Sequence, residues 1–153
     1  MEEGFTLFSH LIFLAISLGF FLYHGVYPTF YWLQIFYYMF CLSLLCAGLG
    51  LITATVTVFI PDMQNVVNIF VQLFFWATPI FWSLSMLPEK YAAVLAVNPM
   101  AYIVQGYRDA FLSQGLIWQH GWDGLIFWTL TIALLLIGIL LLRKMKPHFA
   151  DVL

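Results

Sequence analysis

The chain has 153 residues, of which 64% are hydrophobic and 8% are charged, and its formal net charge is -2. Soluble domains of average composition carry about 25% charged residues, so this chain lacks the polar side chains that would cover a water-soluble surface. The composition therefore excludes an ordinary soluble domain, and the small negative charge gives no indication of a nucleic-acid partner.

Long stretches without Asp, Glu, Lys or Arg predict the membrane spans. Such stretches run through residues 4–61, 63–88 and 124–142. A spanning helix needs about 20 mostly apolar residues, so the first stretch holds two spans and the others hold one each. We therefore predict one all-α integral membrane domain over residues 1–153, with four transmembrane helices at about residues 5–26, 33–60, 66–86 and 121–142.

The second predicted span carries small residues at four-residue spacing, Cys46, Gly50 and Ala54. Small side chains on one helix face allow another helix to approach closely in a membrane, and glycines simply tolerated in lipid are the alternative. Cys41 and Cys46 are five residues apart, which is a poor offset for a disulfide on one helix. We expect both to be buried free thiols.

The third predicted span begins after a break that contains Asp62. A proline inside a helix removes a backbone hydrogen bond, so Pro79 predicts a kink, at which Thr78 helps to satisfy the freed backbone. Asn68 and Gln72 are four residues apart and share a helix face. Polar side chains inside a membrane usually point toward other protein.

Two segments before the last span are too short to cross a bilayer. We predict helices at about residues 88–97 and 99–114, roughly 15 and 23 Å long, against roughly 30 Å for the hydrocarbon core. Asn98 is a favourable N-cap, and Pro99 fits the first turn of a helix. These features predict a re-entrant hairpin that enters the membrane and returns to the same side.

Arg108 and Asp109 lie in the second of these short helices. Adjacent residues of a helix point about 100° apart, so we expect each of these side chains to have its own partner. Tyr107 and Phe111, with Ile103 a turn earlier, form an apolar stripe beside the charges. Two interpretations remain open: Arg108 contacts lipid headgroups at the membrane interface, or the helix lines or gates a path for a polar or anionic cargo.

The basic residues Arg143, Lys144 and Lys146 follow the last predicted span. By the positive-inside rule this end is cytoplasmic. Counting back through four spans places the N-terminus and Asp62 on the cytoplasmic side, and residues 87–120 on the outer side.

Signatures of catalysis and of metal or cofactor binding are missing from the sequence. The histidines have no metal-ligand spacing, no glycine-rich phosphate loop occurs, and nothing groups a nucleophile with a base. We expect no enzymatic activity, no metal and no cofactor, with a membrane-embedded transferase of dispersed active-site residues as the alternative. The histidines are His10, His24, His120 and His148.

The order of motifs in the second half of the chain is similar to that of a known family. The segments FFWATPIFWSLSMLPEKY, Phe74–Tyr91, and NPMAYIVQGYRDAF, Asn98–Phe111, resemble the membrane subunit of ABC-2 type exporters. These permeases export O-antigen, capsule and teichoic-acid polymers in bacteria. The tail KPHFADVL, Lys146–Leu153, resembles the teichoic-acid type.

The resemblance covers nearly the whole chain but only the C-terminal portion of the family's length. It begins at the third span of the family, so the first two spans and the segment that contacts the ATPase fall outside it. Members commonly carry an aromatic-Arg-Asp triplet after the fourth family span, where this chain reads Phe59-Ile60-Pro61-Asp62. The aspartate matches and the arginine does not, so a contact made by that arginine is not expected here.

The resemblance implies a multi-pass permease subunit of the bacterial inner membrane, surrounded by membrane lipids. It implies a second permease copy and separate ATPase subunits as partners, and a lipid-linked glycan or teichoic-acid-like polymer as cargo. It places Asn98, Pro99, Tyr107, Arg108 and Asp109 in a hairpin at the outer mouth of the polymer path.

Two alternatives to polymer export remain open. One is a drug or small-lipid exporter of the same superfamily, and the other is a non-transporting assembly or channel subunit. The resemblance also implies that Asp62 lies in a cytoplasmic loop near the ATPase. The aromatic content of 20% suits a sugar path and a lipid belt equally well.

Overall fold

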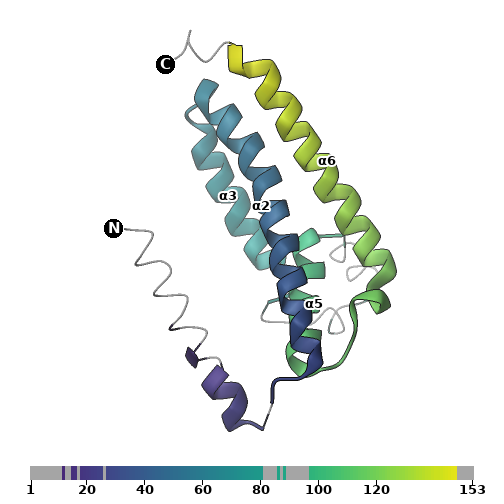
Figure 1. Ribbon diagram of the computed structural model, residues 1–153. Coiled ribbons are helices and arrows are strands. Elements are labelled where there is room, and N and C mark those ends of the chain that lie inside the picture. Colours follow the sequence, from purple (N-terminus) through teal and green to yellow (C-terminus); the bar gives the residue numbers. More distant parts are fainter. Residues whose placement is uncertain are drawn as a thin grey trace.

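The computed structural model describes residues 12, 15–16, 18–25, 27–80, 86, 88 and 97–147, without the side chain of His120. The described residues form helices and connecting loops and contain no strand, as predicted. Figure 1 shows two long helices, α2 and α6, with α3 beside α2 and the short α5 at the lower end. In chain order the elements are η1 (Phe30–Leu33), α2 (Gln34–Phe59), α3 (Met63–Ala77), α5 (Pro99–Leu112), η3 (Ile117–His120) and α6 (Gly121–Met145).

Two of the helices are long and apolar enough to cross a membrane. One runs over Phe30–Phe59, which joins η1 to α2 across 30 residues, and the other is α6 with 25 residues. They pack closely because glycines remove side chains from the contact. A Cβ on Gly138 would lie 2.8 Å from Leu51 Cβ, and one on Gly48 would lie 3.2 Å from the backbone nitrogen of Leu135.

The helix α5 packs against the first halves of α2 and α6 and completes the core at that end. The Tyr102 ring of α5 stacks on Phe127 of α6 with ring centroids 5.0 Å apart. Gly106 lies so close to α2 that a Cβ at this position would overlap the ring of Tyr38. The buried cluster consists of Tyr38, Cys41, Leu45, Tyr102, Ile103 and Phe127.

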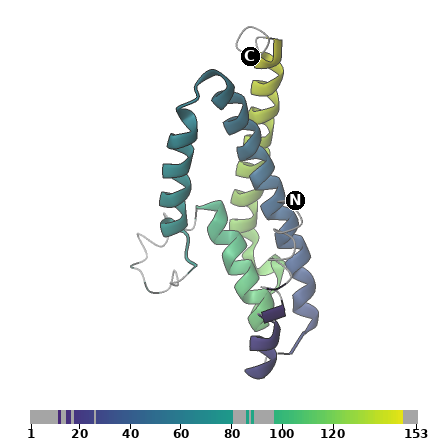
Figure 2. The same ribbon diagram turned by 90° about the vertical axis from the view of Figure 1, so that its left-hand side faces the viewer.

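The helix α3 is attached differently from the other helices. It follows α2 after the turn at Pro61 and Asp62, runs back beside α2, and stands apart from α5 and α6 in Figure 2. None of its residues is buried. Within the described part of the chain, α3 therefore contributes nothing to the hydrophobic core.

Several predicted boundaries can be compared with the described helices. The spans predicted at residues 33–60 and 121–142 correspond to the two helices of spanning length. The third predicted span is helical over Met63–Ala77 and ends before Pro79. Half of residues 5–26 and most of residues 88–97 lie outside the described part, so the count of four spans and the re-entrant hairpin stay predictions.

The ends of the described helices fall into two groups. The turn with Asp62 lies at the same end of the molecule as the C-terminal end of α6, which carries Arg143 and Lys144 (Figures 1 and 2). The loop after α5 lies at the opposite end, beside the start of α2. This grouping is the one expected from the positive-inside count, and the side of the membrane on which each end lies stays a prediction.

The close helix contact falls on a different face of α2 from the predicted one. Cys46, Gly50 and Ala54 are exposed, and a Cβ on Gly50 would meet nothing within 4 Å. The α6 helix instead contacts the face with Gly48. Both cysteines are free, as predicted, but Cys46 is exposed rather than buried.

Candidate functional site: the break after α3 and the helix α5

The end of α3 is set by Thr78 and Pro79. Thr78 has an extended backbone with ψ 132°, as expected for a residue before proline. Its amide donates to the carbonyls of Phe74 and Phe75, at 2.9 and 3.3 Å. Its hydroxyl Oγ1 also donates to Phe74 O at 2.7 Å, so Thr78 satisfies the end of the helix as predicted.

The predicted kink at Pro79 takes the form of a helix end in the described residues. The helix does not continue through Pro79, because the extended Thr78 turns the chain away from the axis of α3. Both Thr78 and Pro79 are buried. The break is therefore a packed feature and not a solvent-exposed loop.

The start of α5 matches the sequence expectation and also contacts the break. Asn98 is the N-cap, its Oδ1 accepts from Met100 N at 3.0 Å, and Pro99 lies in the first turn. The other end of the same amide, Asn98 Nδ2, donates to Thr78 Oγ1 at 3.3 Å. One side chain thus caps α5 and joins its N-terminus to the end of α3.

Arg108 makes the second connection between α5 and the break. Its Nη2 donates to two successive backbone carbonyls, Pro79 O at 2.8 Å and Ile80 O at 3.0 Å. Guanidinium groups form strong, charge-assisted bonds to such acceptors. We name this arrangement the clasp, and it consists of Thr78, Pro79, Ile80, Asn98 and Arg108.

Asp109 points away from the clasp into the loop that follows α5. It is 7% exposed, and its Oδ1 accepts from Gln105 Nε2 at 3.0 Å. A Cβ on Gly115 would lie 3.4 Å from Asp109 Oδ2, so the glycine lets this loop pass close to the carboxylate. Arg108 and Asp109 therefore contact different groups, as the helical geometry predicted.

The loop after α5 is fastened to the start of α2. Ser113 ends α5 in the left-handed conformation with φ 55°, and Thr29 Oγ1 and Ser113 Oγ are 2.8 Å apart. The buried amide of Gln34 donates from Nε2 to Gly115 O at 3.1 Å. These bonds fix the end of α5 that carries Asp109.

The predicted apolar stripe of α5 continues onto neighbouring segments through its aromatic rings. Tyr107 and Phe111 are stacked with ring centroids 6.4 Å apart. Phe111 stacks in turn on Phe21 at 4.9 Å, and Tyr107 lies 6.1 Å from Tyr38. The stripe thus joins α5 to α2 and to the helical segment before it.

Sequence reasoning missed a polar triad inside the aromatic core. Trp128 Nε1 donates to Tyr37 Oη at 2.9 Å, and the hydroxyls of Tyr37 and Tyr102 are 3.2 Å apart. The three residues come from three helices, Trp128 from α6, Tyr37 from α2 and Tyr102 from α5. Tyr102 lies 65 positions after Tyr37 in the chain, and Trp128 lies 91 positions after it. No local sequence signal could have linked them.

The structure brings together only part of the predicted site. Thr78, Pro79, Asn98 and Arg108 meet in the clasp, and Asp109 lies one residue further along α5. Asp62 lies at the far end of α3, where its side chain makes no cap bond. Its predicted contact with an ATPase stays a prediction.

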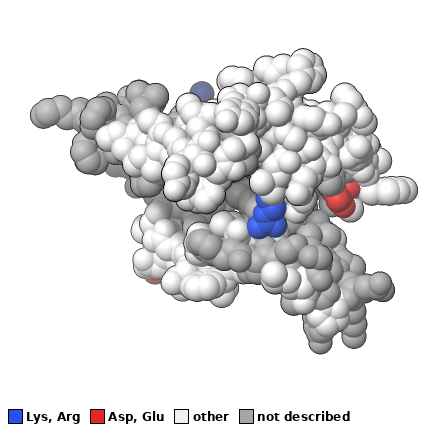
Figure 3. Space-filling view, turned by 90° about the horizontal axis from the view of Figure 1, so that it is seen from below, with Lys and Arg blue, Asp and Glu red and all other residues white. Residues whose placement is uncertain are grey.

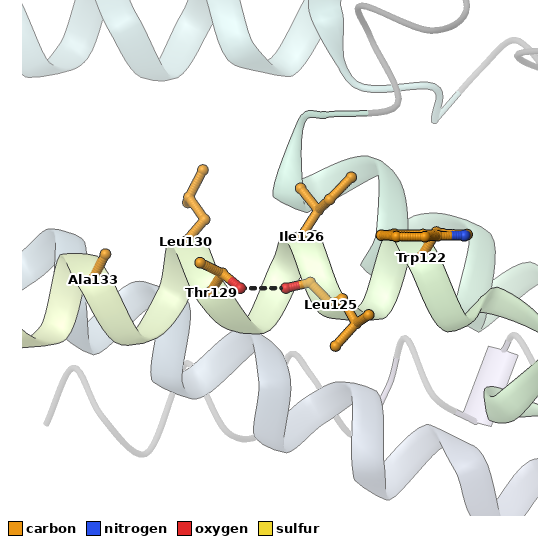
Figure 4. Close-up of a pocket in the computed structure, with 6 residues that line it drawn as sticks. All are labelled: Trp122, Leu125, Ile126, Thr129, Leu130 and Ala133. Carbon is orange, nitrogen blue, oxygen red and sulfur yellow. Dashed lines mark hydrogen bonds between the residues drawn. The ribbon is translucent and has the colours of Figure 1, made fainter.

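Metal-binding groups, charged patches and pockets are the other features that the described residues could offer as a site. Within the described residues no group of three His, Cys, Asp or Glu side chains could hold a metal ion. The described part of the face in Figure 3 is largely uncharged, with small basic and acidic patches that lie apart. A shallow apolar groove of about 470 Å³ on α6 suits hydrocarbon, and it is lined by Trp122, Leu125, Ile126, Thr129, Leu130 and Ala133 (Figure 4).

Comparison with known proteins identifies the family of this chain and several relatives. Residues 4–112 match the family described as ABC-2 type transporter. Over 106 residues the chain is 29% identical to the O-antigen export system permease protein RfbA of Klebsiella pneumoniae. Over 79 residues it is 30% identical to the polysialic acid transport protein KpsM of Escherichia coli.

The chain spans less than half of the length of these relatives. The alignment with RfbA covers 69% of this chain and 40% of that protein. The alignment with KpsM covers 49% of this chain and 31% of that protein. The family match ends at the last residue of α5, so it includes every residue of the clasp.

Proposed function

Because this chain belongs to the ABC-2 type transporter family, we propose that it acts in the permease of a bacterial ABC exporter. Its cargo would be a lipid-linked polysaccharide or a teichoic-acid-like polymer. The observation that carries this proposal is the alignment with an O-antigen export system permease protein, RfbA, and a polysialic acid transport protein, KpsM. The long apolar helices α2 and α6 are consistent with a membrane subunit.

The proposed assembly contains two kinds of partner. Members of this family are transport subunits that work with an ABC ATPase, and we propose that the ATPase here is a separate chain. A second permease copy would complete the path through the inner membrane. This chain would carry out no covalent chemistry, and its role would be to open and close that path.

Within this assembly, the helix α5 would form part of the outer gate. Asn98 and Pro99 start the helix, Arg108 ties it to the end of α3, and Tyr107 and Asp109 lie beside that tie. A movement of α3 or α5 must therefore break or carry with it the bonds of the clasp. This coupling gives the predicted gate residues a mechanical role that does not require contact with the polymer.

The proposal is tested by deleting the gene and measuring polymer on the cell surface with a glycan-specific antibody or lectin. We expect polymer to accumulate inside the deletion strain, and wild-type protein to restore it to the surface. Arg108→Ala, at equal expression, should restore much less. The matched control is Arg143→Ala, which changes the other arginine of the chain, at the far end of α6, and should behave as wild type.

A second measurement separates transport from other membrane roles. The tagged protein, purified from native membranes, should retain an ABC ATPase whose activity depends on the permease. Full surface polymer in the deletion strain would contradict the proposal. Purification without any ATPase would favour an assembly or channel subunit instead.

A further inference from the structure

The polar triad of the aromatic core joins the three packed helices at one point. Trp128 Nε1 on α6 donates to Tyr37 Oη on α2 at 2.9 Å, and Tyr37 Oη lies 3.2 Å from Tyr102 Oη on α5. A single hydroxyl, that of Tyr37, therefore bonds to both other helices. Removing it would separate all three helices at this point, whereas removing either other member would leave one bond in place.

The triad lies among aromatic rings. Tyr102 is buried, its ring stacks on Phe127 with centroids 5.0 Å apart, and it lies 5.5 Å from the ring of Tyr38. The ring of Tyr37 meets that of Tyr38 edge-on at 5.1 Å. Hydrogen bonds in such apolar surroundings are stronger than in water, and a buried donor or acceptor that loses its partner is costly. The triad therefore resists separation more than exposed hydrogen bonds do.

The rings alone would define the position of α5 loosely. Aromatic pairs interact favourably over centroid distances from about 4.5 to 7 Å, so one ring can slide along another with little loss. A hydrogen bond forms over a range of only about half an ångström and weakens steeply as its angle closes. The triad is therefore the part of the core that fixes the depth of α5 between α2 and α6.

Two glycines allow the tyrosines to reach these positions. Gly124 of α6 lies beside the hydroxyl end of Tyr102, where a Cβ would stand 3.4 Å from Oη. Gly106 of α5 lies against the ring of Tyr38, where a Cβ would overlap the ring. Each glycine receives a tyrosine from a neighbouring helix, so α5 is seated on both of its neighbours.

The position of Tyr102 on α5 connects the triad to the clasp. Tyr102 follows the N-cap Asn98 by four residues and precedes Arg108 by six, within one continuous helix. Holding Tyr102 in place therefore also holds the two residues of α5 that bond to the end of α3. On the other side of the clasp, α3 has no buried residue to hold it.

We propose that Tyr37 is a positioning residue for the outer gate. Through Tyr102 it keeps α5, and with it Arg108, stationary against α2 and α6 while α3 moves. The clasp then joins a fixed wall of the gate to a mobile one. This inference rests on the proposed function for the existence of a gate, and it adds which wall stays fixed and which side chain fixes it.

The test uses Tyr37→Phe, which keeps the ring and removes the bonds to Trp128 Nε1 and Tyr102 Oη. Spin labels at Leu112 on α5 and Leu125 on α6, both exposed, report the position of α5 in the purified transporter with its ATPase. In the otherwise wild-type protein we expect one narrow distance distribution that is unchanged by ATP with vanadate. In Tyr37→Phe the distribution should broaden, already without nucleotide.

The matched control is Thr131→Val. It also removes one fully buried hydroxyl from the core, but within the described residues that hydroxyl has no hydrogen-bond partner. Replacing an unpartnered buried hydroxyl by a methyl group of similar shape is nearly neutral. This variant should therefore keep the label distances and the surface polymer of wild type.

Graded variants of the triad sharpen the test. Tyr102→Phe and Trp128→Phe each remove one of the two bonds, so each should broaden the distribution less than Tyr37→Phe. Adding Tyr102→Phe to Tyr37→Phe should change little, because the two substitutions remove a shared bond. Surface polymer at equal expression should fall several-fold in Tyr37→Phe and less in the single-bond variants.

The outcomes separate the positioning role from its alternatives. A wild-type distance between α5 and α6 that changes with ATP would overturn the proposal, as would an unchanged distribution in Tyr37→Phe. Equal broadening between labels at Phe40 on α2 and Leu136 on α6, both exposed, would reduce Tyr37 to general support of the bundle and also overturn it. Absence of any ATPase from the purified protein would contradict the proposed function, while the distances without nucleotide would still decide what holds α5.

Discussion

The helices α2, α5 and α6 form a packed bundle, whereas α3 is joined to it by polar contacts near its C-terminal end. The bundle buries aromatic and aliphatic side chains, and glycines set the spacing of its helices. The helix α3 buries no residue, and the clasp ties the segment after it to α5. The two regions therefore depend on different interactions for their position.

This difference indicates which part of the molecule can move at low cost. Shifting α5 against α2 would require Gly106 to leave the ring of Tyr38 and would open the aromatic core. Shifting α3 uncovers no buried residue of the helix itself and disturbs mainly the hydrogen bonds of the clasp and the buried Thr78 and Pro79 that follow it. Segments with few buried contacts open most easily, so α3 is the part of the described structure best suited to a conformational step.

The largest effect on stability is expected from a substitution at the closest contact of the bundle. Gly106→Ala should lower the free energy of unfolding by about 3 kcal/mol, because overpacking a tight contact forces the helices apart. The Cβ would overlap the ring of Tyr38, a rigid group that cannot move aside without disturbing Tyr102 and Phe127. Unfolding in mixed micelles with increasing SDS, followed by circular dichroism, measures the change.

The matched control for this substitution is Gly50→Ala, in the middle of α2. It makes the same chemical change where a Cβ would meet nothing within 4 Å. Alanine favours a helix over glycine, so this variant should be as stable as wild type or up to about 1 kcal/mol more stable. Equal stability of the two variants would show that the contact between α5 and α2 does not hold the bundle.

The bundle and α3 also differ in how far the sequence predicts them. Two helices of spanning length follow directly from apolar runs, and the start of α5 follows from the Asn98-Pro99 pair. A helical wheel shows that α2 has a small-residue face at Gly50, but it does not show which face meets α6. That choice depends on the partner, whose glycine at position 138 lies 90 residues away from Gly48 in the chain.

The clasp could be predicted only in its parts. The sequence indicates that Thr78 and Pro79 disturb a helix and that Arg108 needs a partner. It does not indicate that the partner of Arg108 is the backbone at Pro79 and Ile80, 29 and 28 residues earlier. Backbone acceptors have no sequence signature, since every residue carries one.

A smaller effect is expected from removing the clasp, and it should fall on α3 alone. Arg108→Ala removes the charge-assisted bonds to Pro79 O and Ile80 O. The free energy that holds α3 to α5 should fall by about 1.5–3 kcal/mol. Spin labels at Val71 on α3 and Leu136 on α6 should show a broader distance distribution in this variant. Both positions are exposed, so the labels leave the core intact.

Two comparisons make the clasp experiment specific. Labels at Phe36 on α2 and Leu125 on α6, both exposed, should keep their distance distribution, because the bundle does not depend on Arg108. Arg108→Lys keeps the positive charge on a side chain without the planar fork and should give an intermediate result. Broadening of both label pairs would mean that Arg108 supports the bundle as a whole.

The smallest effect separates the two roles of Asn98, which caps α5 and contacts Thr78. Asn98→Ala removes both the cap and the contact with Thr78. It should lower the free energy of unfolding in SDS by about 1 kcal/mol, as is typical for loss of an N-cap. Asn98→Ser keeps an oxygen that can accept from Met100 N but loses the Nδ2 donor to Thr78 Oγ1. The stability of Asn98→Ser should therefore be close to that of wild type, while its α3 label distances broaden slightly. If Asn98→Ser and Asn98→Ala lose equal stability, the bond to Thr78 and not the cap is what Asn98 contributes, and α3 would then be part of the cooperative unit formed by the bundle.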